Sequence, residues 1–427
     1  MRRHFLSASL TALLAAAVGC AADEATETAT PDTFVETDTD GSDSADSGAD
    51  TYVDPNPDLC TETVGSICTW AGNGEAGFNG DGLPLLQTMM YWPIDLTFTS
   101  KGRVFVLDWN NHRVRELQED KTLLTVIGTD FVGDGPEDGA GDKVEPGVAG
   151  DTVTLNHPTQ FVELPDGKLL LSAWHNHKMR RYDPETGLVY ITVGGPPGYY
   201  GDGGPAIKAR MNQPISIAVR EDGGFYILDQ RNQDIRLVDK DGVISSVAGK
   251  RDVPPGAPLP KGGFNGDNTP METTFNQPSG SNPPPGGSIA LDDDGVLYIA
   301  DQLNHRIRKI DFTANTVVTI AGKGTAGFSG DGGPAKDAEI NAPRKIAIGP
   351  DGRLYVADQN SHAIRAIDLA KGTIETVAGT GEKGFSGDGG AATDAQLNRP
   401  NGFAFNEHYL YIADTDNHRV RRVTLAK

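Results

Sequence analysis

Short stretches in which apolar residues alternate with polar or small ones run through most of the chain, separated by glycine-rich turns. The clearest group has four such stretches, at residues 345–348, 354–357, 364–369 and 374–378. Alternation with a period of two is typical of β-strands that bury one face. No helical periodicity competes with it between residues 60 and 427. The pattern therefore predicts an all-β chain of short strands.

Two strings of residues each occur six times. The first reads Asp-x-x-Asn-His-x-[Ile/Val]-Arg in most copies, which begin at Asp108, Ala173, Asp229, Asp301, Asp358 and Asp414. The second is an aromatic residue, any residue and Gly-Asp, and its copies end at Asp81, Asp134, Asp202, Asp267, Asp331 and Asp388. Insertions at residues 140–150, 251–261 and 280–287 account for the unequal spacing. Six copies of a four-stranded unit predict a six-bladed β-propeller.

The two ends of the repeated region predict how the ring closes. The last copy stops after its third strand, at Lys427. A stretch of the fourth-strand type, Ile67–Gly72, stands alone before the first copy. Pairing of this N-terminal stretch with the last blade would remove two open sheet edges. We therefore predict one propeller domain over residues 59–427, with its last blade closed by the N-terminal strand.

The repeated motifs resemble NHL repeats. They carry Leu-Tyr-[Ile/Val]-Ala-Asp before Asn-His-Arg-[Ile/Val]-Arg, and Gly-Phe-Ser-Gly-Asp-Gly-Gly-Pro-Ala before both. The Gly-Asp-Gly-Gly form is similar to the repeats of bacterial secreted NHL proteins and of teneurins. The resemblance implies a binding scaffold that does no chemistry and holds no cofactor. Its alternative is a propeller enzyme of the lyase, lactonase or sugar-dehydrogenase type, with a metal near the central channel.

The N-terminal residues predict export. Two arginines and an apolar run precede Ala17-Val18-Gly19-Cys20, which resembles a bacterial lipobox. We predict a lipoprotein signal peptide over residues 1–19 and lipidation of Cys20; the alternative is cleavage near Ala21 without a lipid. Residues 20–58 hold twelve Asp and Glu and neither Lys nor Arg, which predicts a disordered acidic tether. These features predict a lipid-anchored protein of the bacterial cell envelope, attached to the outer membrane.

Charge and cysteine content narrow the possible partners. The net charge of −22 argues against a nucleic-acid-binding surface, and the lipid is the predicted contact with the membrane. If Cys20 carries the lipid, Cys60 and Cys68 remain as a pair, for which we predict a disulfide in an oxidising compartment. We expect a monomeric propeller.

The repeated polar residues have a structural and a metal-binding interpretation. A metal site needs donors that converge within about 2 Å of one ion. The same position in every blade instead forms a ring around the molecule. We therefore expect the repeated Asn and His to bond backbone groups and the repeated Asp and Arg to form ion pairs; no metal is expected. The histidines of this position are His112, His177, His305, His362 and His418.

The candidate ligand site comes from positions at which the blades differ. Two residues after the proline that opens each blade, the chain holds Asp95, Gln160, Ser216, Ser288, Lys345 and Gly402. Beside them lie Trp92, His157, Arg344, Arg399 and Asn401. A mixed polar rim around one opening is typical of a binding site, and the alternative is a set of solvated loop ends. We expect Arg344 and Lys345 to meet an anionic group of a protein, peptide or glycan, and we find no catalytic motif.

Overall fold

The computed structural model describes residues 60–136, 141–251, 253 and 259–426. The predicted signal peptide, Cys20 and the predicted tether over residues 20–58 lie outside these residues. Most of the insertion at residues 251–261 also lies outside them. The predictions made for those segments therefore stay predictions.

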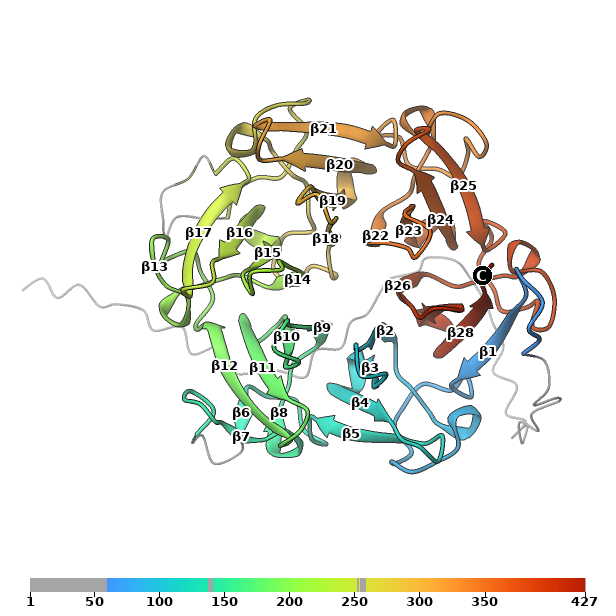
Figure 1. Ribbon diagram of the computed structural model, residues 1–427, viewed down its shortest axis with the longest axis horizontal. Helices are drawn as coiled ribbons and strands as arrows, with labels where there is room; N and C mark the ends of the chain where they lie inside the picture. Colours follow the sequence, from blue (N-terminus) through green and yellow to red (C-terminus); the bar gives the residue numbers. More distant parts are fainter. Residues whose placement is uncertain (1–59, 137–140, 252, 254–258, 427) are drawn as a thin grey trace, which may run out of the picture. The chain divides into compact units, whose positions relative to one another are not determined.

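Six antiparallel sheets surround a central axis, and the first strand of each lies innermost (Figure 1). The first three blades are β2 (Pro93–Phe98), β3 (Val104–Asp108), β4 (Arg113–Leu117) and β5 (Leu123–Ile127); β9 (Pro158–Glu163), β10 (Leu169–Ala173), β11 (Lys178–Asp183) and β12 (Leu188–Gly194); and β14 (Pro214–Val219), β15 (Phe225–Asp229), β16 (Asp234–Val238) and β17 (Val243–Ala248). The last three are β18 (Ile289–Leu291), β19 (Leu297–Asp301), β20 (Arg306–Asp311) and β21 (Thr316–Ala321); β22 (Pro343–Ile348), β23 (Leu354–Asp358), β24 (Ala363–Asp368) and β25 (Thr373–Ala378); and β26 (Pro400–Phe405), β27 (Tyr409–Asp414), β28 (Arg419–Thr424) and β1 (Ile67–Ala71). The six-bladed all-β fold is confirmed.

Shorter elements occupy the loops between these strands. Two-residue strands add β7 (Val148–Ala149) to the second blade and β13 (Gly204–Pro205) to the third, and β6 (Gly135–Pro136) pairs with β8 (Val153–Thr154). Single 3-10 turns precede the inner strands at η1 (Leu85–Gln87), η3 (Gly150–Thr152), η4 (Ala206–Lys208), η6 (Pro270–Glu272), η8 (Ala335–Asp337) and η10 (Ala392–Asp394). Others follow the second strands at η2 (Trp109–Asn111), η5 (Gln230–Asn232), η7 (Gln302–Asn304), η9 (Gln359–Ser361) and η11 (Thr415–Asn417). The connections within a blade are short turns, whereas those from one blade to the next are longer and hold the insertions.

The ring closes as predicted. Strand β1 pairs antiparallel with β28, placing Ile67 opposite Val423 (Figure 1). The last blade therefore combines the two ends of the propeller, and β1 covers the edge that β28 would otherwise expose. The predicted disulfide between Cys60 and Cys68 is present and ties the segment before β1 to that strand.

Apolar side chains fill the spaces between neighbouring blades. Phe105 on β3 contacts Phe161 on β9 edge to face, with ring centroids 5.3 Å apart. Tyr355 on β23 lies 6.4 Å from Phe403 on β26. Both pairs join adjacent blades, so the sheets are apolar on both faces. Apolar and polar residues therefore alternate less regularly along these strands than along strands with one solvated face. The core is therefore a ring of blade-to-blade contacts.

The repeated arginines form the predicted ion pairs, and each is fully buried. Arg115 lies 3.1 Å from Asp81 of the Gly-Asp loop and 3.4 Å from Asp108 at the end of β3. The same pairing of arginine with the loop aspartate recurs in the other blades, at Arg180–Asp134, Arg236–Asp202, Arg308–Asp267, Arg365–Asp331 and Arg421–Asp388. These groups hold the loop against the blade, which is a structural role.

The second blade replaces its missing carboxylate with a residue from the insertion. Ala173 stands where the other blades have the buried aspartate. Asp142 fills that role toward the arginine, 2.6 Å from Arg180 and only 4% exposed. Asn176 Oδ1 accepts the backbone hydrogen bond that the aspartate accepts elsewhere, from Asn156 N–H at 3.0 Å. In this blade Asp142 and Asn176 together make the two contacts that a single aspartate makes in the other blades.

The repeated histidines link neighbouring blades. His177 Nδ1 accepts a hydrogen bond from Gln213 N–H of the next blade at 3.0 Å. His418 does the same for Trp92 at 3.3 Å, across the seam where the ring closes. In the third blade the side-chain oxygen of Gln233 replaces the imidazole, 2.7 Å from Gln277 N–H. The expected bonding to backbone groups is confirmed, and it connects blades rather than stabilising the turn alone.

Candidate functional site

The polar residues predicted to surround the channel do converge on the axis. In five blades they are the second or third residue of an inner strand that begins at a proline, and in the fourth blade Ser288 directly precedes β18. Together with Ile94, Thr159 and Ile215, they line a void of about 10 Å³, which has room for roughly one water molecule. The polar residues are Asp95, Gln160, Ser216, Ser288, Arg344, Lys345 and Asn401.

Two of the predicted ligand contacts already bind each other. Lys345 Nζ lies 2.6 Å from Asp95 Oδ2, and the two side chains are 13% and 3% exposed. Burial raises the pKa of Asp95, and the nearby Lys345 acts against that rise. Asp95 Oδ1 is buried and has no hydrogen-bond partner among the described residues. The pair therefore spans the channel as a buried bridge.

Three further channel side chains bond the scaffold. Gln160 Oε1, Ser216 Oγ and Ser288 Oγ each accept a hydrogen bond from a backbone N–H of the following inner strand. The donors are Ile217 at 2.6 Å, Ile289 at 3.1 Å and Ile346 at 2.8 Å. These polar side chains therefore join the inner strands of neighbouring blades by hydrogen bonds around the axis. This contribution to the fold was not expected from the sequence.

A second ring of buried side chains reaches the axis from the turns after the second strands. One of its contacts runs from Trp174 Nε1–H to Gln230 Oε1 at 3.0 Å, and another from Gln359 Nε2–H to Asn401 Oδ1 at 2.7 Å. Variation between blades at this position, the criterion that selected the Asp95 position, would also have found this ring. Its members are Trp109, Trp174, Gln230, Gln302, Gln359 and Thr415.

The insertion at residues 280–287 covers part of this second ring. Gln230 Nε2–H donates to Pro284 O at 3.0 Å, and Gly286 N–H donates to Gln230 Oε1 at 2.9 Å. These bonds hold the insertion against the side chain of Gln230. It lies beside Ser288, where it helps to close the channel.

The remaining predicted site residues lie beside this second ring, in the loops that precede the inner strands. Trp92, His157 and Arg399 have left-handed backbone conformations and give their N–H groups to the repeated histidines. The His157 ring lies 4.1 Å from Trp109, and its Nδ1 is 2.8 Å from that of His175. Burial lowers the pKa of His157 well below its usual value and that of His175 to about 3. Both imidazoles are therefore neutral near pH 7.

The described residues contain no group of three or more His, Cys, Asp or Glu side chains placed to hold a metal ion. The channel void itself has one carboxylate, that of Asp95, beside two cations. Such a donor set does not fit a divalent ion, because cations dominate it.

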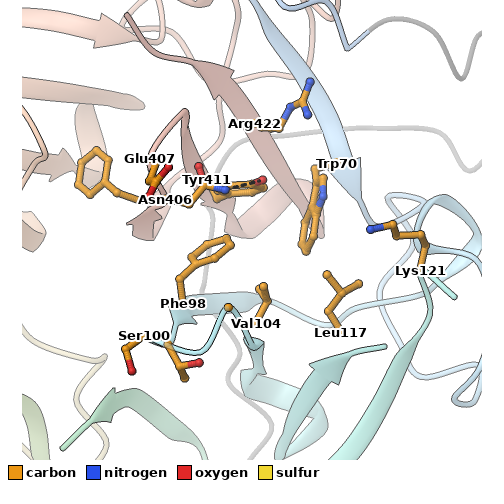
Figure 2. A pocket seen from close by; sticks show the side chains of 13 residues that line it. Trp70, Phe98, Ser100, Val104, Leu117, Lys121, Asn406, Glu407, Tyr411 and Arg422 are labelled. Carbon is orange, nitrogen blue, oxygen red and sulfur yellow. Dashed lines mark hydrogen bonds between the residues drawn. The ribbon is translucent and has the colours of Figure 1, made fainter. Parts of the chain in front are cut away.

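A larger opening lies between the last blade and the first, and sequence reasoning missed it. It encloses about 800 Å³ (Figure 2). We call it the seam groove; it is lined by Trp70, Phe98, Thr99, Ser100, Gly102, Val104, Leu117, Lys121, Phe405, Asn406, Glu407, Tyr411 and Arg422. Ser100 and Asn406 belong to the turns that follow β2 and β26. The groove therefore opens at the end of the inner strands remote from the Gly-Asp loops.

Three aromatic rings form the wall of the seam groove. The Tyr411 ring centroid lies 5.1 Å from that of Trp70 and 4.7 Å from that of Phe98. Figure 2 shows these rings around one space, with Lys121 and Arg422 at its edge. Arg422 also contacts Glu62 at 3.4 Å, whereas Lys121 has no polar partner for its ammonium group among the described residues. The groove thus combines aromatic faces with a charged and polar rim.

The sequence does contain a signal for this groove. Trp70 occupies the outer-strand position that four other blades fill with a smaller aliphatic residue, at Val126, Val247, Ile320 and Val377. An aromatic residue at a position that is aliphatic in the other blades is not explained by the packing that all blades share. Its neighbours Phe98 and Tyr411 come from two other strands, so their meeting depends on ring closure.

Comparison with known proteins supports the resemblance to NHL repeats. The NHL repeat family matches residues 90–117, and the Teneurin NHL domain family matches residues 196–264. Protein SUPPRESSOR OF QUENCHING 1 of Arabidopsis thaliana is 29% identical over 310 residues, covering 70% of this chain and 27% of that protein. NHL repeat-containing protein 2 of Gallus gallus is 25% identical over 366 residues, covering 81% and 48%. This chain thus spans about a quarter to a half of these relatives.

Solved structures of low sequence identity share the fold. A protein of unknown function from Bacteroides thetaiotaomicron gives a TM-score of 0.59 at 16% identity, covering 84% of this chain and 75% of that one. An auxiliary nutrient binding protein from the same organism gives 0.57 at 15% identity, with the same coverage of both chains. These likenesses show the propeller architecture.

Proposed function

We propose that this NHL-repeat β-propeller is an exported binding protein that holds a saccharide in the seam groove without chemical change. The sequence leaves protein, peptide and glycan open as ligands, and the groove favours a glycan. The observation that carries the proposal is the cavity of about 800 Å³ with three aromatic rings on its wall and hydrogen-bonding groups on its rim. The void on the propeller axis, by contrast, has only about 10 Å³ and a lining without aromatic rings.

The chemistry of the lining suits a sugar ring. Aromatic faces carry negative charge density and attract the C–H groups on a pyranose face. Ser100, Asn406 and Glu407 lie beside the rings and offer donors and acceptors to hydroxyl groups. A small number of precisely placed polar groups beside aromatic side chains is typical of small-molecule sites. A saccharide of one to three rings is therefore our proposed ligand.

The engagement of the repeated residues supports binding without catalysis. The buried arginines pair with aspartates, and the repeated imidazoles accept backbone hydrogen bonds. A general acid or base needs a titratable group within reach of a substrate. In the seam groove Glu407 and Lys121 are such groups, but both are exposed on the rim.

Export and lipid anchoring belong to the same proposal. They rest on the basic and apolar residues before Cys20 and on the acidic segment that follows it. No helix in the described part of the chain is long and apolar enough to cross a membrane. One structural neighbour is named as an auxiliary nutrient binding protein. We extend nutrient binding to this chain, and the predicted lipid at Cys20 would place it at the bacterial outer membrane.

Tryptophan fluorescence offers a direct test of the groove. The chain has four tryptophans, and Trp92, Trp109 and Trp174 lie together near the starts of the inner strands, at the end remote from the groove, with ring centroids about 6 Å apart. Trp70 alone lines the seam groove among them. The purified protein would be screened against an array of bacterial and plant oligosaccharides, and hits titrated by calorimetry and fluorescence.

We expect an oligosaccharide that binds to change the tryptophan emission of the wild type. The same oligosaccharide should not change the emission of Trp70→Phe, which lacks the tryptophan in the groove. Trp70→Ala should weaken binding at least tenfold, because an aromatic platform contributes about 1.5 kcal/mol or more. Phe131→Ala, which removes a ring that is 67% exposed and distant from the groove, is the matched control. Saccharide binding that survives Trp70→Ala would place the ligand elsewhere and contradict the proposal.

A further inference from the structure

The central channel contains one more positive charge than it can neutralise. Arg344 and Lys345 are adjacent on β22, and both line the void on the axis with Asp95. Lys345 is paired with Asp95 at 2.6 Å. Arg344 is 4% exposed, its Nε is buried without a hydrogen-bond partner, and no carboxylate of the described residues forms an ion pair with it. Its guanidinium is therefore a buried cation without a counter-charge.

An unmatched buried charge is costly, so such groups in proteins are nearly always paired. Burial lowers the pKa of Arg344 to about 10, and Asp95 acts against that fall. The guanidinium therefore remains charged at neutral pH. Because Lys345 already neutralises Asp95, the charge left over in the channel is that of Arg344.

We propose that Arg344 binds a compact monovalent anion of chloride size in the void on the propeller axis. The charge calls for one negative unit, and the void of about 10 Å³ has room for roughly one water-sized particle. The same chemistry could be met by free chloride or by the single carboxylate of a small solute. A sulfate or a sugar is too large for the space.

This site is independent of the saccharide proposed for the seam groove. No residue lines both sites: the void takes Ile94 and Asp95 from the start of β2, whereas the groove takes Phe98 from its end. The sequence predicted that Arg344 and Lys345 would together meet an anionic group. The geometry assigns that role to Arg344, since Lys345 has its partner.

The chain itself supplies a variant that should fold. The position that follows the opening proline holds Arg344 in the fifth blade, but Ile94 in the first and Ile215 in the third. Both isoleucines are buried beside the same void. Arg344→Ile therefore introduces a side chain that this ring already accommodates twice. Arg210→Gln, which removes an exposed arginine, is the control for a general loss of positive charge.

The test is thermal unfolding of the full chain at pH 7.5 and constant ionic strength. Sodium gluconate, whose anion is too large for the void, would be replaced stepwise by sodium chloride from 1 to 300 mM, and in a parallel series by sodium formate. We expect the melting temperature of the wild type and of Arg210→Gln to rise by about 3 °C in chloride, as for a ligand reaching about a hundred times its Kd. Arg344→Ile should show no such rise, and should melt above the wild type in gluconate.

Crystals grown with sodium bromide give a second readout. An anomalous peak beside the Arg344 guanidinium supports the site. A formate response without a chloride response, lost in Arg344→Ile, supports it with a carboxylate as the occupant. An equal salt response in wild type and Arg344→Ile, or none in the wild type, would overturn it and leave a water molecule as the occupant. None of these results bears on saccharide binding, which is read from Trp70.

Discussion

Replacing Asp142 by alanine should destabilise the protein by about 3 kcal/mol, although Asp142 belongs to an insertion. Its carboxylate is 2.6 Å from Arg180, and the side chains are 5% and 0% exposed. Removing one partner of a buried ion pair costs roughly 3–5 kcal/mol, because the other charge stays buried. Arg180 keeps Asp134 at 3.1 Å, but the side chain of Asp134 is 44% exposed. The lower end of the range therefore applies.

The other blades suggest the rescue. The residue at the position of Ala173 is an aspartate in five blades, where it lies 3.3–3.9 Å from the buried arginine. Ala173→Asp in the Asp142→Ala background should therefore restore most of the lost stability. In the wild type the same substitution adds a second buried carboxylate to an arginine that already has one, and should be neutral or destabilising.

The assay is guanidinium chloride and thermal unfolding of the four proteins, followed by circular dichroism. Asp142→Ala should lower the melting temperature by about 4 °C for a domain of this size. The coupling energy of the double-mutant cycle should reach about 2 kcal/mol. If Asp142→Ala unfolds like the wild type, or if Ala173→Asp fails to rescue it, then Asp142 does not replace the missing carboxylate.

Two further predictions concern contacts between blades. Deleting residues 59–72 should yield aggregated protein by size-exclusion chromatography, since β28 then loses its partner β1 and exposes an edge; a soluble, cooperatively unfolding product would show that the seam is dispensable, and deletion of residues 21–58 is the control. His177→Gln should reduce the loss of stability on acidification. Burial lowers the pKa of His177 to about 4 in the folded protein. The neutral imidazole therefore stabilises the fold above pH 6.5, and that contribution is lost as the pH falls toward 4. Gln233 already serves as the acceptor in the third blade, so the melting temperature of His177→Gln should match the wild type at pH 7.5 and exceed it at pH 5; equal melting curves at pH 5 would contradict this.

The sequence by itself determined the architecture. Six copies of two strings predict the blades, and the displaced fourth strand at Ile67–Gly72 predicts the closure. The ion pairs between Arg115 and Asp81, and their five counterparts, were predicted as well. These features are readable because each is local within one repeat and occurs six times. Repetition exposes the positions that the scaffold requires.

The tertiary structure decided what lies between blades and on the axis. The seam groove needs Trp70, Phe98 and Tyr411 from strands that meet only when the ring closes. Asp142 and Ala173 are distant in the repeat register, so no motif links them. Lys345 and Asp95 were expected on the rim of an opening as ligand contacts, yet they bond each other beside a void of about 10 Å³. The width of a channel depends on how closely six sheets pack, and packing distances are not encoded in any single repeat.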